Sequence, residues 1–309
     1  MEILHYPVLH KEVLESLVID PEKESRLIDC TTGEGGHTAL FLAKYPKLNV
    51  TGLDRDKDIQ KKAIERFKDY GDRFTPVNTW FDDYLSVAES ESADAILFDL
   101  GISIFHYEES ERGFSFRKEE RLDMRLNSEQ RLSAEVIVNE YPEDELADVI
   151  YRFGEERYSR RIARAINEAR QEKRIEFSEE LANIIFHSVP REYRYGRIHP
   201  ATRTFQALRI EVNKELDRIR PALEGAIRVL KKGGRVGVIT FHSLEDRIVK
   251  QTFVSLSSGC VCPKNFPVCV CGNKPKVKII TKKPILPSES ELAMNSRSKS
   301  AKLRVVEKI

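Results

Sequence analysis

The sequence has no long apolar run and almost no net charge. Its 309 residues contain nothing near the roughly 20 consecutive apolar residues that a membrane-spanning helix requires. The first seven residues lack the basic start and apolar core of a signal peptide. Lys and Arg number 51 against 50 Asp and Glu, so net charge alone does not indicate an acidic partner. We therefore expect a soluble, cytoplasmic protein that binds no membrane and uses local charged patches.

Cysteine is scarce outside one short segment. Four of the five cysteines, Cys260, Cys262, Cys269 and Cys271, fall in residues 259–272, unlike the even spread of a secreted disulfide framework. Their C-x-C-x6-C-x-C pattern is compatible with a tetrahedral zinc site that staples a loop, although C-x-x-C is the usual zinc spacing. Reduced thiols or a redox pair are also compatible with it, so no metal ligand is assigned.

Strand and helix patterns alternate through the first third of the chain. We expect strands over 26–31, 49–54, 74–80 and 94–101, with helices over 38–45 and 56–70. This alternation is typical of a parallel, doubly wound α/β sheet.

The alternation is interrupted in the middle of the chain. Strand patterns nearly vanish from about 106 to 203, where amphipathic helices follow one another, and the α/β pattern returns near Thr204. A long helix follows, which Pro221 should kink or restart. We therefore predict the first part of an α/β domain over 1–105, an inserted helical substrate-recognition domain over 106–203, and the second part of the α/β domain over 204–309.

A glycine cluster joins the first expected strand to the first helix. Gly33, Gly35 and Gly36 permit positive φ or the close approach of a ligand, and the helix start presents unpaired N–H groups. Asp54 ends the second strand 21 residues after Gly33, a separation typical of an acid that binds ribose hydroxyls. A nucleoside-bearing cofactor is therefore predicted, with a tight structural turn as the alternative.

Two cofactors are compatible with this turn. A nicotinamide dinucleotide usually needs G-x-G-x-x-G/A, but Thr38 occupies the last position. Asp29 precedes the cluster and could pair with the amino group of a methionine moiety. This favours S-adenosyl-L-methionine. Asp99 ends the fourth strand and should point into the crevice beside the cofactor, unless it only caps the next turn.

Longer stretches of the sequence resemble one known family. They are His5-Tyr-Pro-Val-Leu9, Thr32-Gly-Glu-Gly-Gly-His37, Asp99-Leu-Gly-Ile-Ser103, Arg112-Gly-Phe-Ser-Phe116, Leu122-Asp-Met-Arg125, the run from His199 to Arg209, Ser243-Leu-Glu-Asp-Arg247 and the run from Arg297 to Arg304. Nearly end to end, the sequence resembles the bacterial ribosomal small-subunit RNA (cytosine-N4)-methyltransferases, the RsmH or MraW family. The resemblance implies a Rossmann-like class I S-adenosylmethionine-dependent methyltransferase fold with an inserted all-α subdomain. It also implies N4-methylation of a cytidine in the decoding region of 16S rRNA.

The resemblance also implies the site residues. The family's cofactor positions fall here on Gly35, Gly36, His37, Asp54, Phe81 and Asp99, beside Gly33 of the same turn. His106 stands where the family usually has glutamine, and a histidine there could still donate a hydrogen bond to the cofactor. Asp99 is the candidate catalytic residue, because its carboxylate can accept a hydrogen bond from the cytidine amine. The expected partner is 16S rRNA, within the small ribosomal subunit, and the oligomeric state is left open.

Other candidate residues carry alternatives. Phe114 or Phe116 could stack on the target base or belong to the core, and His199 or His242 could be a general base or a buried, hydrogen-bonded side chain. Arg194, Arg197 and Arg203 are the candidate RNA-binding residues, because arginine and tyrosine alternate over 191–197. The basic run over 157–174 is either a second RNA contact or a solvated helix face.

Two other classes of protein remain as rivals. A catalytically silent RNA-binding assembly factor would keep the fold without binding the cofactor. A nicotinamide-dependent oxidoreductase is disfavoured by the glycine spacing.

Overall fold

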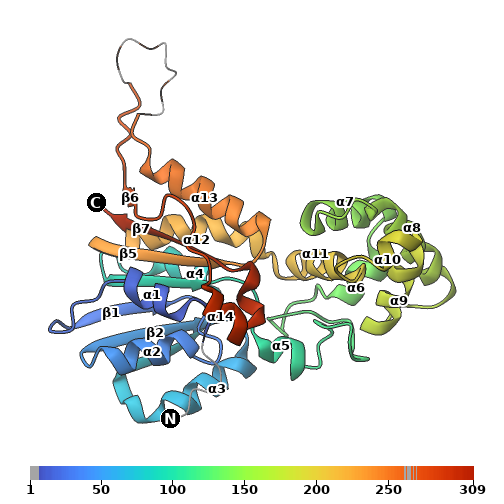
Figure 1. The fold of residues 1–309 in the computed structure, drawn as a ribbon, viewed down its shortest axis with the longest axis horizontal. Coiled ribbons are helices and arrows are strands. Elements are labelled where there is room, and N and C mark those ends of the chain that lie inside the picture. The colour runs from blue at the N-terminus through green and yellow to red at the C-terminus, as the bar shows by residue number, and fades with distance from the viewer. Residues whose placement is uncertain (1–6, 261, 263–265, 267, 269) are drawn as a thin grey trace. The chain divides into compact units, whose positions relative to one another are not determined.

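The computed structural model describes residues 7–309 except 261, 263–265, 267 and 269 (Figure 1). The start of the motif at His5 and one member of the cysteine cluster, Cys269, therefore lie outside the described residues. The chain forms two compact units, one of Met1–Gly101 with Leu216–Ile309 and one of Ile102–Glu215. In the part of the chain that the structure describes, no helix has both the length and the apolarity needed to cross a membrane.

The first unit is built on a seven-stranded sheet with the order β3-β2-β1-β4-β5-β7-β6. Its strands are β1 (Ser25–Asp29), β2 (Leu48–Asp54), β3 (Phe74–Asn78), β4 (Ala93–Asp99), β5 (Leu230–Thr240), β6 (Val277–Ile279) and β7 (Lys302–Lys308). Strands β1 to β5 pair in parallel, whereas β7 is antiparallel to both β5 and β6. This sheet confirms the predicted doubly wound, class I methyltransferase fold, and its order reverses between β1 and β4. Ligands bind at such a reversal, beyond the carboxyl ends of the strands.

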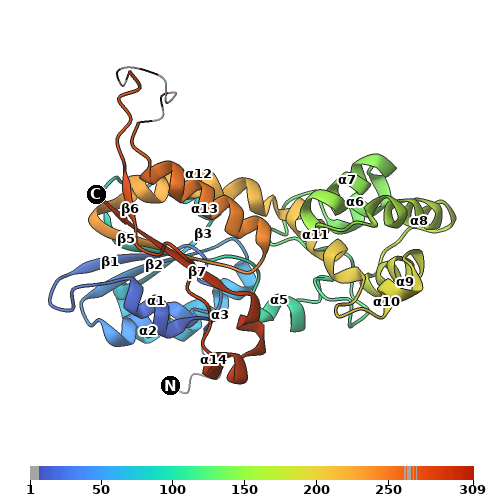
Figure 2. The same ribbon diagram turned by 45° about the horizontal axis from the view of Figure 1, so that its top comes forward.

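Helices cover both faces of this sheet (Figure 2). They are α1 (His10–Ser16), α2 (Gly36–Lys44), α3 (Lys57–Phe67), α4 (Phe81–Val87), α12 (Glu215–Val229), α13 (Ser243–Ser257) and α14 (Glu289–Met294), with 3₁₀ turns η1 (Lys68–Arg73) and η2 (Ser296–Ser300). One hydrophobic core joins α4, α12 and α13 to the sheet, and a second joins α1, α2 and α3 to its other face.

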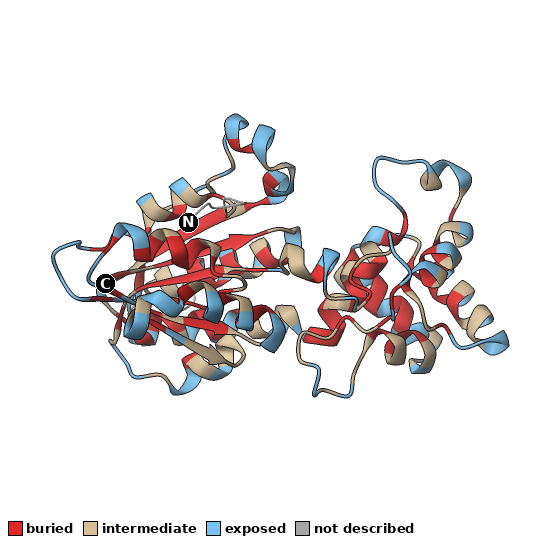
Figure 3. Ribbon diagram, turned by 90° about the horizontal axis from the view of Figure 1, so that it is seen from below, coloured by how far each residue is buried: buried red, intermediate tan, exposed pale blue. Residues whose placement is uncertain are grey.

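Strand β4 shows why the sheet is buried on both faces (Figure 3). Its side chains alternate, so that Ile96 and Phe98 enter one core while Ala95 and Leu97 enter the other. The strand ends at Asp99, the first position whose side chain is partly exposed to solvent after this apolar run.

The second unit is helical. Its helices are α5 (Ile104–Glu108), α6 (Ala134–Glu140), α7 (Glu143–Gly154), α8 (Ser159–Glu172), α9 (Ser178–Ser188), α10 (Arg191–Arg194) and α11 (Ala201–Asn213). They share one hydrophobic core, to which α11 contributes Phe205, Leu208 and Val212. Helices α7 and α11 approach closely at Gly154 of α7. A Cβ on this residue would lie 2.5 Å from the carbonyl oxygen of Arg203 in α11, so the approach depends on glycine. Helix α11 thus belongs to the helical unit, whereas the segments predicted from the sequence placed most of it in the α/β domain.

The long helix predicted from Thr204 is two helices. Helix α11 ends at Asn213, the following residue Lys214 has a left-handed φ of 51°, and α12 begins at Glu215. Pro221 lies inside α12 and interrupts neither helix. The prediction that Pro221 restarts the helix was therefore wrong. The break lies seven positions earlier, at Lys214, which is left-handed although it is not glycine.

Candidate active site

Three aspartates end three neighbouring strands of the sheet. Asp54 ends β2, Asp29 ends β1 and Asp99 ends β4, and these strands are adjacent in the order β2-β1-β4. Because parallel strands bring their carboxyl ends to one edge, the three carboxylates gather at the point where the sheet order reverses. The sequence predicted this placement for Asp54 and Asp99.

The glycine turn between β1 and α2 has the backbone that its sequence predicts. Gly33 and Gly35 have φ of 54° and 82°, in the region that favours glycine. A Cβ on Gly35 would lie 2.2 Å from the ring of Phe67, so no larger residue is accommodated there without movement. The Gly35 N–H donates to the carbonyl of Thr32 at 2.7 Å, which closes the turn directly before α2 begins at Gly36.

Asp29 is buried, and its carboxylate is hydrogen-bonded to residues on both sides of this turn. Its carboxylate accepts hydrogen bonds from the Thr38 hydroxyl at 2.7 Å and from the Thr31 N–H at 3.2 Å. Burial raises the pKa of Asp29, although the bond from Thr38 lowers it. The carboxylate is thus engaged within the protein, and its pairing with a methionine amino group stays a prediction.

Asp54 is held by two backbone N–H groups. Gly33 donates to Oδ2 at 2.9 Å and Asp56 donates to Oδ1 at 2.8 Å. Each oxygen keeps a second lone pair for a further donor, so the fixed carboxylate could receive two neighbouring hydroxyls. Burial raises the pKa of Asp54 to about 7, against the two N–H groups, which lower it.

Asp99 and His37 face each other above the turn. Nε2 of His37, on the buried first turn of α2, lies 3.5 Å from Oδ2 of Asp99. The Asp99 N–H donates to the Thr31 hydroxyl at 2.6 Å, which ties the end of β4 to that of β1. Within the described part of the chain, Oδ1 of Asp99 and Nε2 of His37 are buried and make no hydrogen bond. Buried polar atoms of this kind normally have a partner, so their lack of one indicates a ligand site.

Phe81 begins α4, three residues after Asn78, which pairs with Asp54 in the β2–β3 register. Its half-buried ring packs edge-on against Phe98 with centroids 5.6 Å apart. The contact of Phe81 with the cofactor stays a prediction.

Comparisons with known proteins identify the family of this chain. A family model described as the MraW methylase family matches residues 2–309. The chain belongs to this family. Three relatives named ribosomal RNA small subunit methyltransferase H come from Treponema denticola, Clostridium botulinum strain Kyoto and Carboxydothermus hydrogenoformans. They are 51%, 48% and 46% identical over 100% of this chain and 98%, 100% and 99% of their own lengths. An rRNA methylase structure from Streptococcus thermophilus is 11% identical with a TM-score of 0.42, covering 97% of this chain and 93% of that chain.

Family membership decides between the two candidate cofactors. A methylase needs a methyl donor, and the class I sheet with its glycine turn and strand-end acid is the fold predicted to bind S-adenosyl-L-methionine. The predictions of a methyltransferase and of this cofactor are confirmed. The nicotinamide-dependent alternative is not supported.

Two threonines of the site were missed by sequence reasoning. Thr31 receives the Asp99 N–H and donates its own N–H to Asp29, while Thr38 donates its hydroxyl to Asp29. They directly flank the Thr32–His37 motif that contains the glycine cluster. Hydroxyls that flank a buried strand-end acid are a signal that could have found them, because such an acid needs donors.

The three candidate histidines outside the turn have structural partners. His106 lies in the helical unit, where its Nδ1 accepts from the Ser103 N–H at 3.1 Å at the start of α5. His242 caps α13, with Nε2 3.1 Å from Oε1 of Glu245. His199 stacks on Phe116 with ring centroids 4.7 Å apart, and partial burial lowers its pKa. The contact of His106 with the cofactor stays a prediction, and no general base is assigned.

The predicted RNA-binding arginines have different environments in the helical unit. Arg194 donates to the carbonyls of Val189 and His187 at 3.0 and 2.7 Å, and Arg203 donates to the carbonyl of Glu155 at 3.1 Å. Arg197 is exposed, two residues after Tyr195, which is 74% exposed. The exposed segment 195–197 thus combines a cation with an aromatic ring, whereas Arg194 stabilises the end of α9.

The basic run over 157–174 likewise contains arginines that bind groups of the protein and arginines that line a hollow. Towards its end, Arg170 donates to the Val138 carbonyl at 2.8 Å and Arg174 pairs with Glu135 at 2.8 Å. Near its start, a hollow of about 450 Å³ is lined by Arg157, Arg160 and Arg161, together with Asp148, Tyr151, Tyr158 and Ser159. Only the start of the run therefore presents cations around a concave surface.

Proposed function

We propose that the protein transfers a methyl group from S-adenosyl-L-methionine to N4 of a cytidine in the decoding region of 16S rRNA. The names of its relatives support an rRNA of the small ribosomal subunit as the substrate. The observation that carries the proposal is Asp99, a strand-end acid with a buried oxygen that lacks a hydrogen bond among the described residues, beside the glycine turn. A carboxylate at this place can accept a hydrogen bond from an amine that is to be methylated.

We propose that the glycine turn and four side chains hold the cofactor. Asp54 accepts from both ribose hydroxyls, because backbone N–H groups already orient its two oxygens. Phe81 packs against the adenine, and the turn of Gly33, Gly35 and Gly36 lets the backbone approach the ligand. His37 and Asp99 face the reacting end, where their unpaired polar atoms lie.

The pH dependence of cofactor binding follows from Asp54. Its ionised form accepts from two hydroxyls, whereas its protonated form has one oxygen converted to a donor. Since its pKa is about 7, we expect cofactor affinity to fall as the pH drops through 7. Isothermal titration between about pH 8 and pH 6 measures this trend. Asp54→Asn should bind weakly at every pH, and a flat wild-type profile would contradict the role of Asp54.

The stability of the cofactor-free protein should change with pH in the opposite sense. The folded pKa of Asp54 lies above the value of about 3.9 in unfolded chains, so protonation favours the folded state. This stabilisation is complete below about pH 4 and is lost as the pH rises through about 7. Asp29, whose pKa is also raised, acts in the same direction. Thermal unfolding at several pH values measures this effect. The melting temperature of Asp54→Asn should change less between about pH 4 and pH 7 than that of the wild type.

The proposed chemistry depends mainly on positioning. The bound cofactor supplies an electrophilic methyl group on its sulfonium. The cytidine amine is a weak nucleophile because its lone pair is delocalised into the ring, so its orientation matters greatly. Asp99 accepts a hydrogen bond from the amine, which directs the nitrogen lone pair and stabilises the positive charge that develops on the nitrogen. The backbone carbonyls of Leu100 and Gly101, the next two residues of the chain, are further candidate acceptors.

The helical unit offers surfaces for the RNA. Phe114 is buried in its core, whereas Phe116 is half-buried and forms one face of an aromatic stack with His199. Of the two phenylalanines, Phe116 is therefore the better candidate for stacking. Exposed Tyr195 and Arg197 suit base stacking and phosphate contact, as in other proteins that bind single-stranded RNA.

Methyl transfer to isolated small ribosomal subunits tests the proposed function. Subunits that lack the modification are incubated with labelled S-adenosyl-L-methionine, and the product is digested to nucleosides and mapped on the rRNA. We expect labelled N4-methylcytidine at one position of the decoding region. Label in another nucleoside would overturn the target. Cofactor binding without transfer to any ribosomal substrate would favour the rival of a silent assembly factor.

The same assay separates RNA-binding from structural arginines. Arg197→Ala and Tyr195→Ala should each raise the KM for the ribosomal substrate about 5- to 10-fold with little change in kcat. Arg194→Ala should lower thermal stability instead, because carbonyls of Val189 and His187 lose their donor. The matched control is Arg220→Ala, since Arg220 is an exposed arginine of α12 that pairs with Glu224. An equal KM change in this control would mean that only net charge matters.

A further inference from the structure

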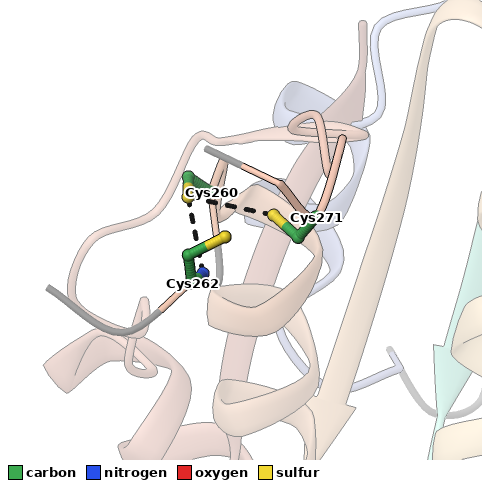
Figure 4. Close-up of side chains that lie close together, drawn as sticks. All are labelled: Cys260, Cys262 and Cys271. Atoms are coloured by element: carbon green, nitrogen blue, oxygen red, sulfur yellow. Dashed lines mark hydrogen bonds between the residues drawn. The ribbon is translucent and has the colours of Figure 1, made fainter. Parts of the chain in front are cut away.

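Three described cysteines converge in the segment between α13 and β6 (Figure 4). The Sγ atoms of Cys260, Cys262 and Cys271 all lie within 4.8 Å of one another, and those of Cys260 and Cys271 are 3.8 Å apart. In an extended chain, side chains two residues apart point to the same side. The spacing C-x-C therefore lets both sulfurs of a pair face one point.

The sulfur separation matches a shared metal ion better than a disulfide. A disulfide bond would bring two sulfurs to about 2.05 Å. Two thiolates on a tetrahedral zinc ion, with Zn–S bonds of about 2.3 Å, lie about 3.8 Å apart. The distance between Cys260 and Cys271 has this value.

Backbone N–H groups point at each of the three sulfurs. Cys262 N–H donates to Sγ of Cys260 at 3.4 Å, Val270 N–H donates to Sγ of Cys262 at 3.4 Å, and Asn273 N–H donates to Sγ of Cys271 at 3.5 Å. Hydrogen bonds of this kind stabilise the negative charge of a thiolate and orient it towards a metal. The chain thus provides partners for the ionised form of each sulfur.

The described parts of this segment have no hydrophobic core to hold them. The core of the α/β unit reaches Leu256 and resumes at Val277, while Phe266, Val268 and Val270 are 48%, 70% and 72% exposed. At its base, the segment is closed by hydrogen bonds from Lys276 N–H to the Leu256 carbonyl at 2.8 Å and from the Asn273 side chain to the Gly259 carbonyl at 2.6 Å. A segment of this length without a core usually needs a cross-link or a metal.

The segment lies at the edge of the sheet opposite the active site. Val277 begins β6 and pairs with Lys308, and the preceding residue of β7, Glu307, pairs with Arg235 near the start of β5. The start of β5 lies at the opposite end of the parallel strands from their carboxyl ends, where Asp99 lies. Helix α13 spans the distance between these two ends of the sheet, about 22 Å for its 15 residues. A metal here would act on structure and not on methyl transfer.

We propose that Cys260, Cys262 and Cys271 bind a structural Zn²⁺ ion as thiolates. The sequence contains a further cysteine, Cys269, which lies outside the described residues. Thiolates select zinc over the harder ions magnesium and calcium. Binding releases the thiol protons, so affinity should fall as the pH is lowered.

Metal analysis of the full-length protein tests this proposal. Protein purified without chelators should contain about one zinc per chain by mass spectrometry of the metal. Cys260→Ser and Cys271→Ser should each hold less than about a tenth of that amount, whereas Cys30→Ala should keep it. Cys30 is the matched control because it is buried at the end of β1, outside the cluster. Circular dichroism checks that each variant is folded.

A second measurement on the unaltered protein does not depend on how the variants fold. Replacement of the zinc by cobalt should produce the intense sulfur-to-cobalt charge-transfer absorption of a thiolate-rich tetrahedral site. Wild-type protein that stays metal-free after incubation with zinc, with all cysteines reactive towards a thiol reagent, would overturn the proposal. Iron with visible absorption, or a mass loss of about 2 Da per oxidised cysteine pair, would replace it with an iron–sulfur cluster or a redox pair. None of these outcomes depends on whether the protein methylates rRNA.

Discussion

Asp99→Asn should lower the kcat of methyl transfer by about 10²–10³-fold, with cofactor affinity changed less than about tenfold. Asparagine keeps the size of the side chain, and its amide oxygen can still accept a hydrogen bond. It lacks the negative charge that stabilises the positive charge developing on the amine. The contact with His37, whose Nε2 lies 3.5 Å from Asp99 Oδ2, is also weakened. Single-turnover methyl transfer and isothermal titration measure the two effects separately.

The control for Asp99 is Asp83→Asn. Asp83 is exposed in the first turn of α4, so its replacement removes one negative charge from the same unit without touching the strand ends. We expect it to change kcat less than about twofold. If Asp99→Asn retained wild-type turnover, the acceptor of the amine would have to be another group, and the backbone carbonyls after Asp99 would be the first to consider.

Gly35→Ala should abolish detectable cofactor binding and lower the free energy of unfolding by about 2–4 kcal/mol. Two causes act together. The φ of Gly35 is 82°, which strains any residue with a Cβ, and that Cβ would lie 2.2 Å from the ring of Phe67. The turn must shift, and with it the Gly33 N–H that orients Asp54. Denaturant unfolding and isothermal titration provide the two measurements.

A glycine with a similar φ and no close neighbour separates these two causes. Gly233 has a φ of 81°, against 82° for Gly35, and a Cβ on Gly233 would meet no described atom within 4 Å. Gly233→Ala should therefore cost only about 1 kcal/mol and leave cofactor binding intact. Shortening the clashing ring in the double variant Gly35→Ala, Phe67→Leu should recover part of the lost stability. Additive losses would show that the ring contact is not the cause.

The strand positions were predicted well from the sequence because apolar runs that end at an acid carry strong local signals. The expected strands over 49–54 and 94–101 correspond to β2 and β4. Residues that are buried on both faces of a sheet must be apolar along the whole strand, so the pattern is visible without any tertiary contact. The antiparallel direction of β7 has no such signal and follows from its pairing with β5.

The helix boundary near residue 214 shows where local signals fail. Proline is a strong helix breaker in a sequence, so Pro221 was the expected break. The structure instead ends α11 at Asn213, and Lys214 follows in a left-handed conformation that lysine rarely adopts. Phe205, Leu208 and Val212 of α11 are buried in the core of the helical unit. Such strain is visible only once the packing is known.

The roles of polar side chains divide in a similar way. The residue types of the site could be predicted from the sequence, because a glycine turn, a ribose acid 21 residues later and a strand-end acid form a local pattern. The fold was needed to find that Thr31 and Thr38 donate to Asp29, that His242 caps a helix, and that Arg194 donates to backbone carbonyls while Arg197 is exposed. A side chain's chemistry is a property of its residue type. Its partners depend on which distant backbone groups the fold brings within about 3 Å, and no local pattern in the sequence records them.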